Sequence, residues 1–192
     1  MRLFFSLPPD PAARSALAEI QRAWRRRDRM GQVRWLPEEA FHLTVAFLGE
    51  VDRADELAEA TTLAFSPPPP AFSVPFSGAG WFPSERHPRV AAVELAEHPA
   101  LAGMLNRLHD AIDAAGLVAD RRPFRGHITI GRVRGRVRPR FPASESCPGA
   151  YAVTGLALMR SHLEPQGARH DPLATWDFAP TLSQNDSAPG QI

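Results

Sequence analysis

A run of four prolines, Pro67 to Pro70, limits how this chain of 192 residues can fold. Proline has no backbone N–H and a fixed φ angle, so such a run lies neither inside an α-helix nor in a central β-strand. Segments with regular hydrophobic periodicity lie on both sides of the run. We therefore predict that residues 66–70 form a boundary or a crossover between two structured parts of the chain.

The periodicity predicts short strands mixed with three helices, which is typical of an α+β domain. We expect strands at residues 2–7, 33–36, 41–48, 72–81, 89–95, 124–133, 151–160 and 173–178. We expect helices that begin at Asp10-Pro11, at Asp52 and at Pro99. Together they form a single domain over residues 1–182, and the polar residues 183–192 are expected to be a disordered tail.

The first of two His-x-Thr motifs lies in the predicted strand FHLTVAFLGE, residues 41–50. Side chains along a strand alternate between its two faces. His42 and Thr44 therefore share one face. The opposite face is apolar and consists of Phe41, Leu43, Val45 and Phe47.

The second motif lies in the predicted strand FRGHITIGRVR, residues 124–134. Here Arg125, His127 and Thr129 share one face by the same alternation. The tetrads HLTV and HITI match in residue type at every position, and a helix precedes each of them. If the two strands lie side by side, two imidazoles and two hydroxyls converge on one cleft.

This set of side chains suits the hydrolysis of a phosphodiester. The reaction needs a base that takes a proton from water and an acid that protonates the departing oxygen, and histidine does either near neutral pH. Threonine hydroxyls and arginine stabilise the charge on the phosphate oxygens. A single His-x-Thr is more often structural, because buried histidine and strand threonine are common. Two copies with matching alternation favour a functional site.

Arginine supplies all 22 basic side chains, since the chain contains no lysine. Without a lysine nucleophile, a covalent lysyl-nucleotide intermediate cannot form, which disfavours ATP-driven RNA joining. Eight of the arginines lie within residues 121–140, a stretch that contains no acidic residue. Guanidinium groups bond two phosphate oxygens at once. The stretch therefore favours a polyanionic substrate, and the alternative is a solvated loop.

No metal and no cofactor are expected. The histidine spacings match no zinc signature, and the single Cys147 has no cysteine partner. No apolar run approaches the ~20 residues of a membrane span. The apolar stretch in the first residues, MRLFFSLPPDP, is shorter than a secretory signal needs. We expect a monomeric, cytoplasmic protein.

The two motifs resemble those of the 2H phosphoesterase superfamily, and the match is closest to its RNA 2',3'-cyclic phosphodiesterase branch, also called 2'-5' RNA ligase-like. The resemblance extends over most of the chain. It includes the blocks MRLFFSLPPD, RWLPEEAFHLTVAFLGEVD, GWFPSERHPRVAAVEL, RPFRGHITIGRVR and LALMRSHLEPQGARHDPLATW. The chain departs from the family where Ala46 replaces a frequent basic residue, Gly126 a frequent proline and His170 a frequent tyrosine.

The resemblance implies a bilobal α+β fold, with two pseudo-symmetric lobes of sheet and helix and the tetrads facing each other across a central cleft. It implies that His42 is the proton donor and His127 the proton acceptor, and that Thr44 and Thr129 bind the phosphate. Arg125 shares the face of His127, so we expect it to contact the phosphate or the adjacent ribose.

The function implied is metal-independent hydrolysis of a terminal RNA 2',3'-cyclic phosphate to a 2'-phosphate. A relative that acts on a small cyclic nucleotide or on 2',5'-linked oligonucleotides would carry the same tetrads. A non-catalytic module that binds RNA ends is a third interpretation, and the intact histidines speak against it. Energy-neutral joining of RNA through a 2',5' bond also stays open.

We predict that activity needs no divalent metal, because two histidine motifs already supply an acid and a base. Hydrolysis of a 2',3'-cyclic phosphate should proceed at the same rate before and after exhaustive chelation. A loss of activity that one particular cation restores would contradict this prediction.

Overall fold

The computed structural model describes residues 1–120, 122–135, 147–164 and 167–180, which form nine strands and three α-helices. The helices are α1 (Pro11–Arg27), α2 (Ala54–Ala64) and α3 (Pro99–Ala114), and a 3-10 turn spans Glu38–Ala40. The strands are β1 (Arg2–Leu7), β2 (Val33–Trp35), β3 (Leu43–Glu50), β4 (Phe72–Phe82), β5 (Val90–Leu95), β6 (His127–Val133), β7 (Ala150–Val153), β8 (Gly155–Glu164) and β9 (Gly167–Asp177). Within these residues, no helix is long and apolar enough to cross a membrane.

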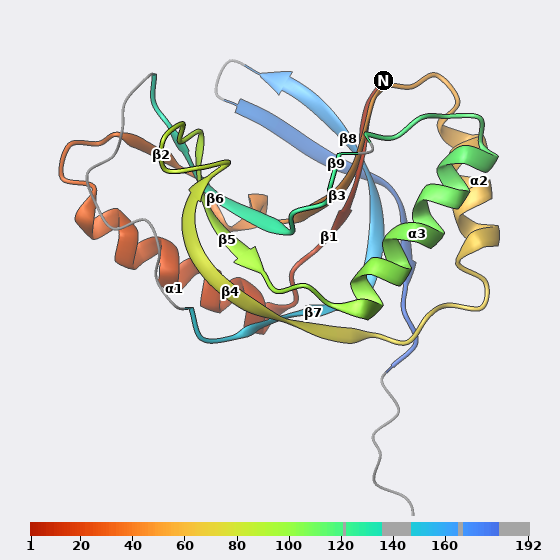
Figure 1. Cartoon of the computed structure of the whole chain (residues 1–192). Helices are drawn as coiled ribbons and strands as arrows, with labels where there is room; N and C mark the ends of the chain where they lie inside the picture. Colours follow the sequence, from red (N-terminus) through yellow and green to blue (C-terminus); the bar gives the residue numbers. More distant parts are fainter. Residues whose placement is uncertain (121, 136–146, 165–166, 181–192) are drawn as a thin grey trace, which may run out of the picture.

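The strands form one antiparallel sheet in the order β7-β4-β5-β6-β3-β1-β8-β9, with β2 paired to β6 (Figure 1). The two motif strands, β3 and β6, are neighbours at the middle of this order. They pair through a single register position, Leu43 opposite Ile128. The sheet therefore consists of two halves that meet at a short seam, which confirms the predicted α+β architecture with two lobes.

Each half repeats the same path of the chain. In the first, β1 leads through α1 to the motif strand β3, and β3 pairs antiparallel with β1. In the second, β5 leads through α3 to the motif strand β6, and β6 pairs antiparallel with β5. Beyond the two tetrads, this duplication is one of structure rather than of sequence.

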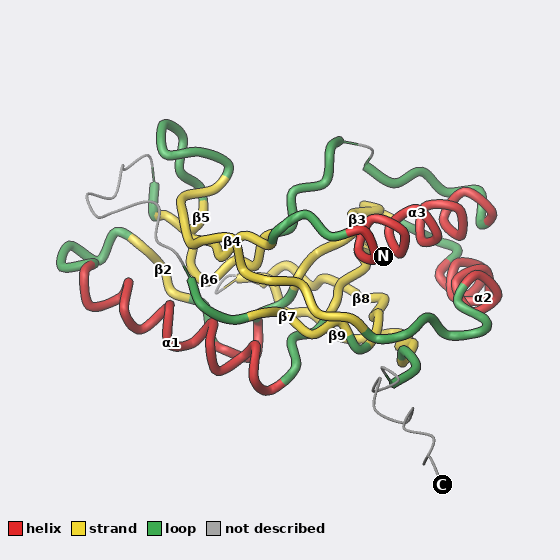
Figure 2. Tube along the Cα trace, turned by 60° about the horizontal axis from the view of Figure 1, so that its bottom comes forward, coloured by secondary structure: helices red, strands yellow, loops and turns green. Residues whose placement is uncertain are grey.

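The helices are exchanged between the halves, so the two lobes interlock. Helix α1 follows β1 but lies beside β6, where the buried side chain of Gln21 donates from Nε2 to the carbonyl of Ile130 at 2.8 Å. Helices α2 and α3 pack against each other on the other side of the molecule (Figures 1 and 2). Trp176 on β9 donates to the hydroxyl of Thr62 on α2 at 2.9 Å.

The proline run connects α2 to β4, and β4 belongs to the other half of the sheet. Two backbone hydrogen bonds join this connection to Ala179. The N–H of Ala179 donates to the carbonyl of Pro69, and the N–H of Ala71 donates to the carbonyl of Ala179. The predicted crossover at residues 66–70 is therefore confirmed. That residues 1–182 form one domain stays a prediction, and the predicted tail at residues 183–192 lies outside the described residues.

Three local predictions were wrong. The strand predicted at residues 151–160 is two strands, β7 and β8, which pair with β4 and with β1 respectively. The N-cap position of α2 is Arg53 rather than Asp52, and no side chain makes a capping hydrogen bond there. Phe47, predicted on the apolar inner face, is 57% exposed. The register shift at Val45, between Leu43 and Phe47, causes this, because a single shift reverses the alternation of faces along β3.

We predict that Gly131 has to be glycine for β2 to lie against β6. A Cβ atom there would lie 2.6 Å from Cγ1 of Val33 and 2.9 Å from Cε3 of Trp35. Gly131→Ala should lower the free energy of unfolding by about 1–3 kcal/mol, the usual cost of overpacking, measured by urea denaturation.

The matched control is Gly103→Ala in α3, where a Cβ meets no atom within 4 Å. This change should raise the free energy of unfolding by up to about 1 kcal/mol, since alanine is the better helix former. Equal stability of the Gly131→Ala variant and the wild type would show that β2 moves aside without cost.

Candidate active site

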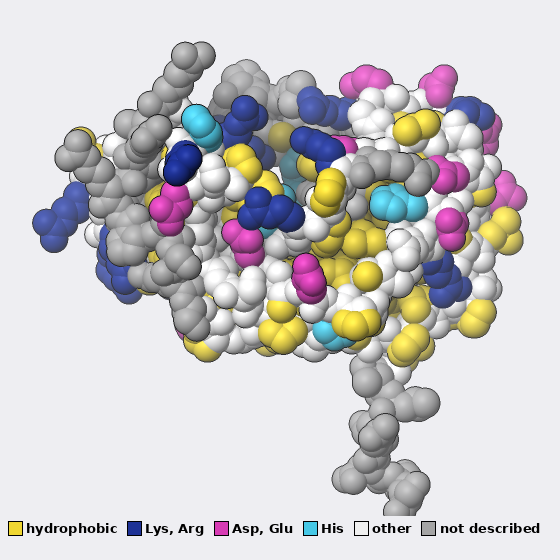
Figure 3. Space-filling view, viewed as in Figure 1, with side chains coloured by type: hydrophobic (Ala, Val, Ile, Leu, Met, Phe, Trp, Pro, Cys, Tyr) yellow, Lys and Arg dark blue, Asp and Glu magenta, His cyan; other side chains and the backbone are white. Residues whose placement is uncertain are grey.

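The seam between β3 and β6 brings both His-x-Thr motifs together. Leu43 and Ile128, which pair across the seam, are fully buried. His42 and Thr44 flank Leu43, and His127 and Thr129 flank Ile128, so all four point away from the buried face of the seam. Figure 3 shows a hollow in the middle of one face of the molecule, where arginine and histidine side chains gather. The arrangement predicted for the two motifs, with the strands side by side, is what the structure has.

Both histidines are held by the same local hydrogen bond. Nδ1 of His42 lies 2.8 Å from the carbonyl oxygen of Ala40, and Nδ1 of His127 lies 2.8 Å from that of Arg125. A carbonyl only accepts, so Nδ1 carries the proton in each ring. Nε2 is then the free nitrogen of both imidazoles. In each motif, the carbonyl two residues before the histidine thus sets its tautomer and its orientation.

The surroundings of His42 disfavour its charged form. Burial is the largest effect and lowers its pKa from 6.5 to about 4. The bond to Ala40 opposes this, whereas His170, Arg132 and His127 lower the pKa further. The ring of His42 lies 5.4 Å from that of His170, centroid to centroid. These surroundings favour the uncharged form of His42 at neutral pH.

His127 has different neighbours. Burial lowers its pKa, while the bond to the carbonyl of Arg125 and the negative charge of Glu94 raise it. The guanidinium of Arg125 lowers it again. The ring of Phe82 stacks on the imidazole with a centroid separation of 3.8 Å and an angle of 15° between the planes.

Arg125, predicted to contact the phosphate, lies beside His127 but already has protein partners. Its Nη2 is 3.3 Å from Oε2 of Glu94, and its Nη1 donates to the carbonyl of Pro83 at 3.2 Å. Its guanidinium carbon lies 4.7 Å from the centroid of the Phe82 ring. A contact between Arg125 and a phosphate stays a prediction.

Two residues outside the motifs, Arg132 and His170, also lie in the cleft. Arg132 is close enough to lower the pKa of both His42 and His170. A register shift between β5 and β6 after Thr129 carries Arg132 onto the face of the histidines, where unbroken alternation would have placed Gly131. His170 lies opposite Ser161 in the pairing of β8 with β9, and its ring packs edge-on against Phe4 at 4.9 Å. In the sequence, its replacement of a frequent tyrosine is a signal for it.

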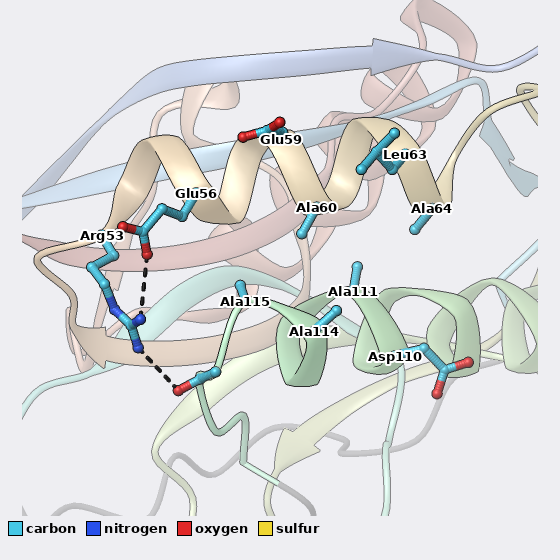
Figure 4. Close-up of a pocket in the computed structure, with 11 residues that line it drawn as sticks. Arg53, Glu56, Glu59, Ala60, Leu63, Ala64, Asp110, Ala111, Ala114 and Ala115 are labelled. Carbon is cyan, nitrogen blue, oxygen red and sulfur yellow. Dashed lines mark hydrogen bonds and ion pairs between the residues drawn. The ribbon is translucent and has the colours of Figure 1, made fainter.

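An open pocket of about 690 Å³ between α2 and α3 is not this site. Alanines of the two helices face each other across it, and Arg53 bonds Glu56 and the carbonyl of Gly116 at one end (Figure 4). The remaining charged residues of its lining are acidic, which disfavours a phosphate ligand. It contains none of the seven histidines of the chain.

Comparison with known proteins shows that this chain is similar to phosphoesterases. The family described as LigT-like phosphoesterase matches residues 7–92. A Thermus thermophilus protein named RNA 2',3'-cyclic phosphodiesterase is 32% identical over 185 residues, 87% of this chain and 85% of that protein. A protein of the same name from Geobacillus stearothermophilus is 31% identical over 163 residues, 82% of this chain but 50% of that longer protein.

Solved structures of similar fold span nearly the whole chain. One from Thermus thermophilus superposes with a TM-score of 0.76 at 28% identity and covers 93% of this chain and 98% of that one. Escherichia coli LigT in complex with 3'-AMP gives a TM-score of 0.71 at 28% identity, with 92% and 97% covered.

We predict that His42 of the ligand-free protein titrates with a pKa of about 4. Inorganic phosphate should raise this pKa, because an anion beside the imidazole favours its charged form. Nitrogen-15 NMR of labelled histidine measures both values, with His42→Ala to assign the signal.

The same shift affects stability. The folded pKa lies below the unfolded value of 6.5, so the unfolded chain takes up the proton first and the free energy of unfolding falls as the pH drops from 6.5 towards 4. His42→Ala should weaken this dependence. A wild-type titration of His42 near 6.5 would contradict the prediction.

Proposed function

The chain belongs to the LigT-like phosphoesterases, the 2H family, and is a phosphodiesterase; from this premise we propose that it hydrolyses the 2',3'-cyclic phosphate at the end of an RNA. The product we propose is a 2'-phosphate with a free 3'-hydroxyl. The catalytic groups are His42 as proton donor and His127 as proton acceptor, and Thr44 and Thr129 bind the phosphate.

The observation that carries this proposal is the pair of histidines locked in the same tautomer on the two strands of the seam. In-line displacement at phosphorus needs the entering and leaving oxygens on opposite sides. Two imidazoles, one from each strand and each with a free Nε2, supply a proton-transfer group for each of these oxygens.

In the proposed reaction, Nε2 of His127 takes a proton from water as the water oxygen bonds to phosphorus. The bond from phosphorus to the 3'-oxygen breaks, and that oxygen takes a proton from Nε2 of charged His42. The hydroxyls of Thr44 and Thr129 donate to the non-bridging oxygens, and Arg132 offsets their negative charge. The proton gained by His127 and the one lost by His42 are then exchanged with solvent.

The charge state of His42 depends on the substrate. A general acid has to be protonated, whereas burial, His170 and Arg132 hold the pKa of His42 at about 4 in the absence of substrate. The cyclic phosphate brings a negative charge to the same place and favours the imidazolium. In this proposal the substrate itself therefore charges the acid that cleaves it, so His42 is uncharged until a phosphate is bound.

RNA is the proposed partner because relatives are named for that substrate and because the cleft carries Arg132 and Arg125. A small cyclic nucleotide is the second candidate, favoured by the 3'-AMP complex of Escherichia coli LigT. The cytoplasmic location and the monomeric state belong to the proposal and rest on the sequence alone.

The deciding experiment is incubation of the protein with a short RNA that ends in a 2',3'-cyclic phosphate. Phosphorus NMR should identify the product as a 2'-monoester. His42→Ala and His127→Ala should each lower kcat/KM by about 10²–10⁴-fold, the usual contribution of an acid or base. Adenosine 2',3'-cyclic phosphate, tested alongside, compares the two substrate classes.

The matched control is His109→Ala on α3, which should retain wild-type turnover. A 3'-monoester product would contradict the proposed 2'-phosphate and leave the mechanism with two histidines standing. Near-normal turnover by either cleft variant would show that its histidine is structural, and binding of the RNA without turnover by the wild type would favour the non-catalytic module.

A further inference from the structure

Three side chains lie in a connected series beside His127: Glu94 on β5, Phe82 on β4 and Arg125 just before β6. Glu94 on β5 lies directly opposite His127 in the strand pairing, and its Oε2 is 3.3 Å from Nη2 of Arg125. The Arg125 guanidinium lies over the ring of Phe82, the last residue of β4, at 4.7 Å. That ring in turn stacks on the imidazole of His127 at 3.8 Å. The contacts form one series from Glu94 through Arg125 and Phe82 to His127.

An arginine in this place has a chemical drawback. A positive charge near an imidazole makes the imidazole a weaker base, and Arg125 does lower the pKa of His127. Glu94 acts in the opposite direction, and its effect is larger than that of Arg125. Among the described residues, His42 is a further titratable group near His127, across the seam.

We propose that Glu94 is a positioning residue for the reaction: its carboxylate holds Arg125 against Phe82, which braces the ring of His127, and it balances the positive charge of Arg125 beside that ring. This role rests on the proposed function, in which His127 is the proton acceptor. Nδ1 of His127 donates to the carbonyl of Arg125 and not to Glu94. Glu94 therefore acts on His127 in two ways: by its contact with Arg125 and by the electrostatic effect of its charge on the imidazole.

The position of Glu94 in the sheet suits this role. Because it faces His127 across the β5–β6 pairing, its distance from the imidazole is set by the strand backbone. The pair of Glu94 and Arg125 is partly exposed, with 35% and 52% of the side chains accessible. A pair of this exposure adds little to overall stability, so removal of the carboxylate should leave the fold intact.

The experiment is a histidine NMR titration together with a pH profile of kcat on a saturating 2',3'-cyclic phosphate, since kcat reports the enzyme with substrate bound, in which His42 is charged. In Glu94→Gln, the pKa of His127 should fall, and the acidic limb of the profile should move to lower pH with it. The plateau of kcat should drop about tenfold, the lower end of what supporting partners of reactive groups contribute. In Glu94→Gln/Arg125→Gln, where both charges are gone, the pKa of His127 should return towards the wild-type value.

The matched control is Glu97→Gln, which removes an exposed carboxylate just after β5 and should change neither measurement. A purely structural role of Glu94 would lower activity without moving the acidic limb, and this result would overturn the proposal. So would an equal pKa of His127 in the wild type and in Glu94→Gln, or the same lowered pKa in the single and the double variant.

The NMR measurement keeps this inference separate from the proposed function. If the wild type hydrolyses no cyclic phosphate but the pKa of His127 moves as described, the proposed substrate is wrong while the charge balance at His127 stands. If hydrolysis occurs and the pKa does not move in Glu94→Gln, the inference is wrong and the proposed function stands.

Discussion

The site depends on one short contact between two strands, the pairing of Leu43 with Ile128. Both side chains are fully buried, so a shift of one residue in either strand would turn a buried apolar side chain towards the cleft and a histidine towards the core. The apolar core therefore fixes the register of the seam. The same register sets His42 and His127 side by side, so the burial of two aliphatic residues positions the two imidazoles of the candidate site.

The interlocking of the halves protects this seam. A single pairing position would be a weak joint between two independent lobes, but α1 leaves the first half to pack beside β6 of the second. Gln21 of α1 also donates to the carbonyl of Leu36, which ties the segment after β2 to the same helix. The chain that enters β3 is thus held by the opposite lobe, and the two halves cannot separate there without unpacking α1.

The tetrads and the face that each exposes were predictable from sequence, because alternation is a local property of a strand. The residues that complete the cleft were not. Arg132 lies on the histidine face only because of an irregularity in the β5–β6 register, and Phe47 left its predicted face for the same kind of reason in β3. His170 reaches His42 through the pairing of β9 with β8 and of β8 with β1, which no local pattern reveals.

The duplicated frame gives both histidines the same backbone lock, yet their charged surroundings differ. Burial lowers the pKa of both imidazoles; Arg132 and His170 lower that of His42 further, whereas Glu94 raises that of His127. The symmetry of the fold therefore determines where the two imidazoles stand, and burial and the charged neighbours determine how readily each takes a proton. An anion bound in the cleft would act most strongly on His42, because the groups around His42 disfavour its charged form most. On this argument the proposed proton donor becomes charged when a phosphate binds, while the pKa of the proposed proton acceptor depends on groups of the protein itself.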